Sequence, residues 1–202
     1  MLTKMEFAAR LKNACLTVIA AEAELTEIDA KFGDADHGFT MAKVCNAIIA
    51  AMEDSDGGIQ TLLDDAAMAV MSINGGSAVP LWNTWLDGMQ EGAPDAEEVD
   101  VPGIQAIFAR AFEELDEMSG AKVGDKTMMD ALIPASEAIA AYEGTSEAEL
   151  FTLAAAAAAA GAENSKNFPS KFGRARSYGT KTIGTPDAGA VSMAKFFEGL
   201  AR

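Results

Sequence analysis

Apolar side chains recur at intervals of three and four residues in eight successive segments, and this spacing predicts a chain built from α-helices. The first segment, residues 3–32, is typical, with Phe7, Leu11 and Val18 on one side. The others run over 38–53, Leu62 to Ile73, 78–90, Ile104 to Met118, 127–142, Ser146 to beyond Ala160, and 187–200. We expect no β-strand, because no stretch shows a convincing strand pattern.

Short loops join these eight helices, which favours antiparallel neighbours in one all-α, up-and-down bundle or barrel. We expect a single domain over residues 1–202, because no loop is long enough to separate two cores. In this topology alternate loops lie at the same end. The four loops of unusual composition are alternate ones, at 33–38, 74–79, 120–126 and 163–188. The other three, at 54–58, 91–101 and 143–145, are ordinary polar turns, so we expect one site at one end of the bundle.

The net charge of the chain argues against some classes of binding partner. Its 15 Lys and Arg against 31 Asp and Glu give a net charge of −16, which argues against binding to nucleic acid or to an anionic membrane. The N-terminus has no signal-peptide layout, and no apolar run reaches the roughly 18 residues of a membrane span. We therefore expect a soluble, cytoplasmic protein, with Cys15 and Cys45 as buried thiols in a reducing compartment.

Three carboxylates, the only histidine and two glycines fall within the ten residues Asp29 to Gly38. Asp29 would project from the end of the first helix, with Asp34 and Asp36 in the loop that follows. Oxygen ligands alone suit a hard cation such as Mg²⁺ or Ca²⁺ better than zinc. The alternative is that Asp34 and Asp36 cap the second helix, whose N-terminus favours negative charge. Spacing alone leaves both open.

His37 lies beside these carboxylates and has several conceivable roles. It can act as a general base or a phosphoryl carrier. It can equally be a structural hydrogen-bond donor, or contribute only its backbone to a ligand. The sequence does not choose between these roles.

Two further loops have features typical of phosphate binding. Gly75, Gly76 and Ser77 precede a helix, where exposed N–H groups and the helix N-terminus favour an anion. The segment 166–181 is basic in an otherwise acidic chain, and Arg174 within it could reach a phosphoryl group with two parallel hydrogen bonds. A solvated surface loop is the alternative for this segment. Asp187 is either the N-cap of the last helix or a ligand contact.

Taken together, five motifs resemble the L subunit, the nucleotide-binding domain, of the dihydroxyacetone kinase family. They are Asp29-x4-Gly-Asp-Ala-Asp-His-Gly38, Gly75-Gly-Ser77, Gly124-Asp-Lys-Thr-Met128, Gly173-Arg-Ala175 and Ile183-Gly184-x-x-Asp187-x-Gly189. They occur in the order of the family and span residues 29–189. The resemblance implies an eight-helix barrel with ADP or ATP at its open end.

The resemblance also implies roles for individual residues. Asp29, Asp34 and Asp36 would bind two Mg²⁺ ions that bridge the nucleotide phosphates. The two ions would bring a charge of +4 against −3 on the three carboxylates, which leaves a net charge of +1. His37, Gly38, Phe39, Thr40, Ser77 and Ala78 would lie along the phosphates. Gly120, Met128, Asp187, Ala188 and Gly189 would hold the nucleoside, and Arg174 would approach the phosphates as the catalytic residue.

The chain departs from the family pattern at Val79, Asn83, Thr40 and the run Arg176-Ser-Tyr178. It also has no second histidine to bind a ketose covalently, so the resemblance implies a K-type ketose-binding partner subunit. Either ATP or a subunit of a phosphotransferase system would supply the phosphoryl group. A regulatory module that senses nucleotide without kinase turnover is the rival interpretation. The ketose and the oligomeric state, a homodimer included, stay open.

Overall fold

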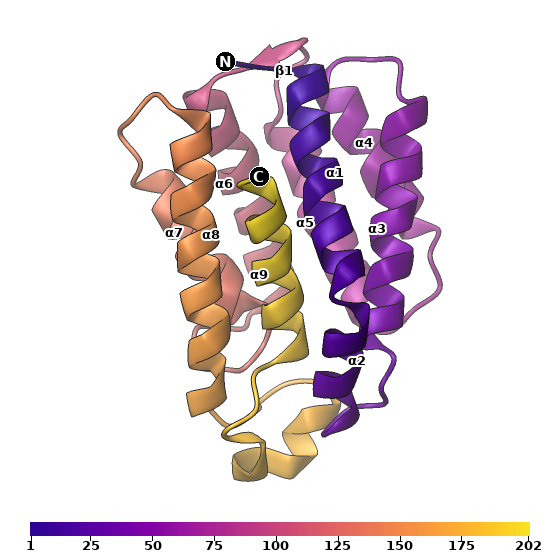
Figure 1. The fold of residues 1–202 in the computed structure, drawn as a ribbon, viewed down its shortest axis with the longest axis vertical. Coiled ribbons are helices and arrows are strands. Elements are labelled where there is room, and N and C mark those ends of the chain that lie inside the picture. The colour runs from indigo at the N-terminus through magenta and orange to yellow at the C-terminus, as the bar shows by residue number, and fades with distance from the viewer.

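The computed structural model describes residues 1–202 and consists almost entirely of helices (Figure 1). The helices are α1 (Lys4–Ala20), α2 (Glu22–Ala30), α3 (His37–Asp54), α4 (Ile59–Met71), α5 (Ala78–Gly92), α6 (Val101–Ser119), α7 (Met129–Ala140), α8 (Glu147–Asn164) and α9 (Ala188–Leu200). Two 3₁₀ segments, η1 (Ser165–Asn167) and η2 (Arg174–Thr182), lie between α8 and α9. The predicted all-α architecture is confirmed.

Two details of the prediction are wrong. The first predicted helix is two helices, because the backbone at Ala21 (φ −91°, ψ 6°) interrupts it between α1 and α2. The chain also contains a two-stranded antiparallel sheet, β1 (Leu2–Thr3) with β2 (Glu98–Val99). Strands of two residues are too short to show an alternating pattern, so they could not be predicted.

Helix starts follow the local chemistry of the sequence. Thr3 and Glu6 form a reciprocal capping box at α1, and the Asp100 side chain accepts a hydrogen bond from the amide of Gly103 at α6. At α8, the predicted cap Ser146 accepts from the amide of Glu149 at 3.3 Å. These side chains satisfy amides that a helix leaves unpaired in its first turn.

Neighbours in sequence are neighbours in space through most of the bundle, and α9 packs back against α1 to close it. The core is continuous and rich in aromatic rings. Trp82 and Trp85 of α5 meet Phe196 of α9 edge to face, with ring centroids 5.3 Å apart in both pairs. At Gly161 a Cβ would lie 2.0 Å from the carbonyl oxygen of Asp130, so α7 and α8 pack too closely there for any side chain.

The two ends of the bundle differ. The N-terminus and the small sheet lie at one end in Figure 1, and the long α8–α9 connection lies at the other. Helices α3, α5, α7 and α9 all begin at that second end, where the four unusual loops meet. None of the helices is both long enough and apolar enough to cross a membrane.

Candidate functional site

A cavity of about 440 Å³ lies where the four unusual loops meet. Its lining includes Asp29, Asp34, Asp36 and His37 from the α2–α3 loop, Gly76 and Ser77 before α5, Lys126 to Met128 before α7, and Arg174 and Asp187 to Gly189 from the α8–α9 connection. This volume lies within the range of small-molecule sites. The gathering of the alternate loops at one site, predicted from the antiparallel topology, is therefore present in the structure.

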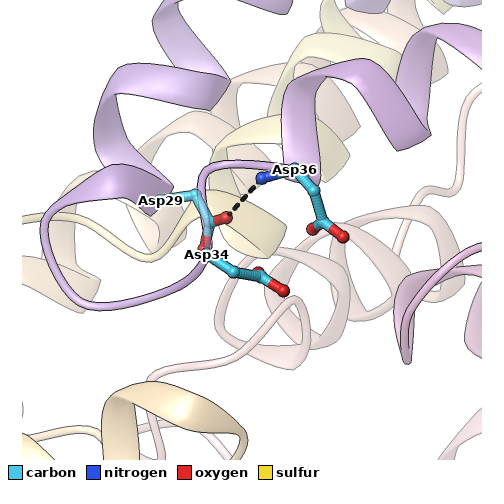
Figure 2. Close-up of side chains that lie close together, drawn as sticks. All are labelled: Asp29, Asp34 and Asp36. Atoms are coloured by element: carbon cyan, nitrogen blue, oxygen red, sulfur yellow. Dashed lines mark hydrogen bonds between the residues drawn. The ribbon is translucent and has the colours of Figure 1, made fainter.

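The three carboxylates converge from the end of α2 and the loop after it (Figure 2). One oxygen from each of Asp29, Asp34 and Asp36 lies within 4.8 Å of the other two. Asp29 also accepts hydrogen bonds from the amides of Asp36 (3.1 Å) and His37 (3.4 Å), so it holds the loop in place. A Cβ at Gly33 would lie 2.0 Å from Oδ1 of Asp29, and a glycine is needed there.

The cluster is not explained by helix capping. Asp36 is the N-cap residue of α3, yet its side chain makes no capping hydrogen bond. Burial raises the pKa of Asp36, and the neighbouring charge of Asp34 raises it further, which is a sign of repulsion that Arg174 offsets only in part. Three clustered oxygen donors under mutual repulsion fit a hard divalent cation such as Mg²⁺.

A loop from the opposite side of the cavity reaches this cluster. We call residues 166–184 the lid loop. A terminal guanidinium nitrogen of Arg174 lies 2.7 Å from Oδ2 of Asp34, and the rings of Tyr178 and Phe32 lie 5.2 Å apart. The Arg174 side chain is 72% exposed, so its ion pair is a weak one that a ligand can displace.

The His37 ring joins two helices. Its Nε2 lies 3.1 Å from the hydroxyl of Ser192, and that hydroxyl donates to the carbonyl of Gly189 at 2.9 Å. The ring nitrogen therefore donates to the Ser192 oxygen and ties the start of α3 to the start of α9. Burial lowers the pKa of His37, which favours the neutral ring. Of the roles open to His37, the geometry favours the structural donor.

Four helix N-termini face the cavity. The first residues or N-caps of α3, α5, α7 and α9 (His37, Ala78, Met128 and Ala188) all lie in its lining. A helix N-terminus carries a partial positive charge, which favours a bound anion. At Gly76 a Cβ would meet nothing within 4 Å, so the backbone is open to a ligand there. The cavity thus offers negative side chains on one side and positive helix ends around the rest.

A buried polar network supports the cavity wall and was missed in the sequence. The Lys126 ammonium donates to the carbonyls of Ser165 (2.8 Å) and Thr185. The Asp130 carboxylate accepts from the amides of Gly124 (2.7 Å) and Thr127 (2.8 Å). The motif Gly124 to Met128 was visible in the sequence, but nothing in it indicated that the lysine would be buried.

Asp187 caps α9 in the structure. Its Oδ2 accepts from the amide of Ala190 at 2.8 Å, and its own amide donates to the hydroxyl of Ser165 at 2.9 Å. Burial is the largest cause that raises the pKa of this carboxyl, to about 7. Asp187 also lines the cavity, so the N-cap position and a ligand contact are compatible.

Of the residues to which the family resemblance assigns a role, all but three line the cavity. Gly38 is buried against α2, where a Cβ would lie 2.1 Å from the carbonyl oxygen of Glu22. Phe39 is 54% exposed and its ring lies 4.2 Å from the Lys43 ammonium. Gly120 ends α6 with a left-handed backbone (φ 62°). Their contact with a ligand stays a prediction.

The departures from the family pattern have visible places in the structure. The Asn83 side chain donates to the carbonyl of Ala67 at 2.9 Å and links α5 to α4. Val79 is buried in the core, Thr40 is buried at the cavity, and Tyr178 makes the aromatic contact with Phe32. None of these changes removes a carboxylate of the cluster.

Comparison with known proteins identifies relatives of this arrangement. The DAK2 domain family matches residues 31–202. An L-erythrulose kinase of Pectobacterium atrosepticum is 35% identical over 202 residues, which cover 96% of this chain and 34% of that protein. The chain thus spans about a third of the length of the curated kinases that it matches at this level.

Shorter relatives and a solved structure agree with this match. The ADP-binding subunit DhaL of the PEP-dependent dihydroxyacetone kinase of Escherichia coli is 26% identical, over 93% of this chain and 91% of that protein. The crystal structure of the dihydroxyacetone kinase from C. freundii with AMP-PNP and Mg²⁺ aligns with a TM-score of 0.73 at 26% identity, over 96% of this chain and 33% of that one. The chain therefore belongs to the DAK2 domain family, and its resemblance to the L subunit of dihydroxyacetone kinases is confirmed.

Proposed function

We propose that this protein binds ADP or ATP with two Mg²⁺ ions and transfers a phosphoryl group to a short-chain ketose, such as dihydroxyacetone, held by a K-type partner subunit. The observation that carries this proposal is the composition of the cavity. Three carboxylates, four helix N-termini and one arginine meet around about 440 Å³. A nucleotide polyphosphate with divalent cations matches that pattern of charge.

The carboxylates would hold the metal ions. Asp29, Asp34 and Asp36 supply only oxygen donors, and three such ligands leave room in a magnesium shell for phosphate and water. When bound, Mg²⁺ neutralises charge on the nucleotide phosphates and on the group in transfer. Asp29 would also keep its loop in shape, because its Oδ2 accepts two backbone hydrogen bonds.

The phosphates would lie between the helix N-termini and the lid loop. We propose that His37, Gly38, Phe39, Thr40, Ser77 and Ala78 lie along them. Phosphoryl transfer depends on positioning and charge more than on a covalent protein intermediate. Arg174 would stabilise the transferring group, since a guanidinium that pairs with a carboxylate pairs equally well with phosphate oxygens.

The nucleoside would occupy the other side of the cavity. We propose that Gly120, Met128 and the residues from Asp187 to Gly189 hold it. At Gly189 a Cβ would lie 3.3 Å from the amide nitrogen of Met128, so the start of α9 and the start of α7 approach closely there. A glycine at this position leaves the cavity open to a flat ligand.

The donor of the phosphoryl group has two alternatives, and the relatives' names are consistent with both. Either ATP is a consumed substrate, as the names erythrulose kinase and triokinase allow, or resident ADP is rephosphorylated by a phosphotransferase-system subunit, as the name of the PEP-dependent, ADP-binding DhaL subunit allows. In both cases the ketose would be held outside this chain. We also propose a cytoplasmic location and a single functional domain over residues 1–202.

A reconstituted assay tests the proposal. The chain is mixed with a K-type subunit, Mg²⁺ and dihydroxyacetone or erythrulose, and with either ATP or a phosphotransferase donor. We expect ketose phosphate to form with one of the two donors, and to form at a much lower but measurable rate with Arg174→Ala. Nucleotide binding without turnover under any of these conditions would instead support the rival function, a nucleotide-sensing module.

A further inference from the structure

The lid loop is closed at its base by a short set of hydrogen bonds, which we call the neck. The amide of Gly184 donates to the carbonyl of Lys166 at 2.8 Å, and the amide of Asp187 donates to the hydroxyl of Ser165 at 2.9 Å. Further into the loop, the amide of Ser170 donates to the hydroxyl of Thr182 at 2.9 Å. The segment that enters the lid loop and the segment that leaves it are therefore held side by side at the neck.

One side chain from another part of the chain donates hydrogen bonds to both segments of this neck. The Lys126 ammonium donates to the carbonyl of Ser165, where the chain enters the lid loop, and to that of Thr185, where it leaves. Lys126 is only 4% exposed, and the carboxyl groups of Asp187 and Asp130 lie near its ammonium. A buried ammonium bonded to two carbonyls makes charge-assisted bonds that water does not compete for.

The backbone of Lys126 is also unusual. Its φ of 62° lies in the left-handed region, which a residue with a long side chain rarely adopts. This conformation, next to the start of α7, places the lysine at the cavity lining. The fold thus tolerates strain at the one residue whose side chain spans the neck.

The neck helps to hold the tip of the loop, together with Lys171, whose amide donates to the carbonyl of Asp125 (3.1 Å) and whose ammonium lies 2.6 Å from the Asp125 carboxylate. Arg174 is at the tip, and its guanidinium reaches Asp34 across the cavity. The tip also contacts the α2–α3 loop through the rings of Tyr178 and Phe32. A small rotation at the neck would therefore move Arg174 over the carboxylates.

We propose that Lys126 is a positioning residue that fixes the neck of the lid loop and, through it, the place of Arg174 in phosphoryl transfer. The second half of this proposal depends on the proposed function, and the first half does not. Lys126 acts here through the loop, because its ammonium donates to carbonyls on both sides of the neck.

The first test measures the neck without any nucleotide. Hydrogen exchange is followed at the amides of Ser170 and Gly184 in the full chain and in Lys126→Met, which keeps the length of the side chain. We expect roughly tenfold faster exchange in the variant, the size expected for loss of a charge-assisted hydrogen bond. Lys181→Met is the control, because Lys181 is exposed on the same loop, and it should exchange like the parent.

The second test is a double-mutant cycle in the reconstituted kinase. Lys126→Met should lower kcat by roughly 10- to 100-fold, since a misplacement of about 1 Å can cost that much. Its effect should vanish in the Arg174→Ala background, because a positioning residue has nothing left to position. Lys126→Arg, which keeps the charge and the donors, should recover part of kcat.

The outcomes separate the two proposals. Unchanged exchange at Ser170 and Gly184 in Lys126→Met overturns the neck function, whatever the activity. Faster exchange with fully multiplicative effects of the two substitutions on kcat overturns the positioning of Arg174. Absence of turnover in the parent chain defeats the proposed function and leaves the exchange result standing. Should Lys126→Met fail to fold, Ser165→Ala weakens the same neck and must show the same pattern.

Discussion

The guanidinium of Arg174 lies 2.7 Å from the carboxylate of Asp34, so the lid loop and the carboxylate cluster are joined by a direct ion pair. In this structure Arg174 is the cation that offsets part of the charge on the cluster. A divalent ion bound to Asp34 would take over that function. Arg174 and the metal therefore compete for one carboxylate, and this competition has measurable consequences.

Replacement of Arg174 by alanine should change metal and nucleotide binding in opposite directions. We expect Mg²⁺ alone to bind up to about fivefold more tightly, because an exposed ion pair contributes at most about 1 kcal/mol. Nucleotide should bind more weakly, because phosphate loses a guanidinium. Calorimetry with each ligand gives both values. Weaker Mg²⁺ binding in the variant would show that Arg174 does not compete at Asp34.

Asp34→Ala should abolish Mg²⁺-dependent nucleotide binding and leave the helical fold intact, because Asp34 makes no contact that α3 needs for its cap. Circular dichroism checks the fold and calorimetry checks the affinity. Asp95→Ala is the matched control, since Asp95 is an exposed carboxylate outside the cavity. If nucleotide affinity in Asp34→Ala equals that of the control, the cluster is not the metal site.

Gly33→Ala should disrupt the metal site without removing a ligand. The new Cβ would lie 2.0 Å from Oδ1 of Asp29, which forces that carboxylate away from its partners. We expect Mg²⁺ affinity to fall at least as far as in Asp29→Ala. Gly76→Ala, whose Cβ has open space, should keep Mg²⁺ affinity and weaken only nucleotide binding. Equal Mg²⁺ affinity in the parent and Gly33→Ala would contradict this geometry.

The carboxyl of Asp187 should make stability depend on pH in the neutral range. Burial raises its pKa from 3.8 to about 7, so between these values the folded chain keeps a proton that the unfolded chain releases. Stability therefore falls as pH rises from about 4 to about 7, with a slope of at most about 1.4 kcal/mol per unit. Above about pH 7 this contribution is constant.

Asp187→Asn isolates this effect, because asparagine can still cap α9 but does not titrate. Urea unfolding of the parent chain and the variant at about pH 4.5 and about pH 8 gives the difference. The parent should lose stability relative to the variant as pH rises. Parallel pH profiles of the two proteins would mean that the carboxyl of Asp187 titrates normally.

Much of the fold could be predicted because helical periodicity is a local property of the sequence. The spacing of residues such as Phe7, Leu11 and Val18 needs no knowledge of distant contacts. The end of the bundle that carries the site followed from topology, since alternate loops of an up-and-down bundle meet. The capping of α8 by Ser146 could also be predicted, because Glu149 follows it three residues later.

Other features depend on contacts between distant segments and left no local signal. The pairing of Leu2 with Val99 brings together residues that are 97 positions apart in the chain. The burial of Lys126 depends on Ser165 and Thr185, and the bond between His37 and Ser192 on the packing of α3 against α9. A lysine or histidine at such positions looks like any surface residue in the sequence alone.

The most direct test of the account is the dependence of ADP binding on Mg²⁺ in the unmodified chain. Calorimetric titrations with ADP are performed in excess Mg²⁺ and in EDTA, and the metal bound per chain is counted in the complex. The account predicts tight binding with two Mg²⁺ ions per ADP and no measurable binding in EDTA. ADP binding of equal affinity in EDTA would contradict it, because the three carboxylates would then repel the phosphates that they are proposed to hold.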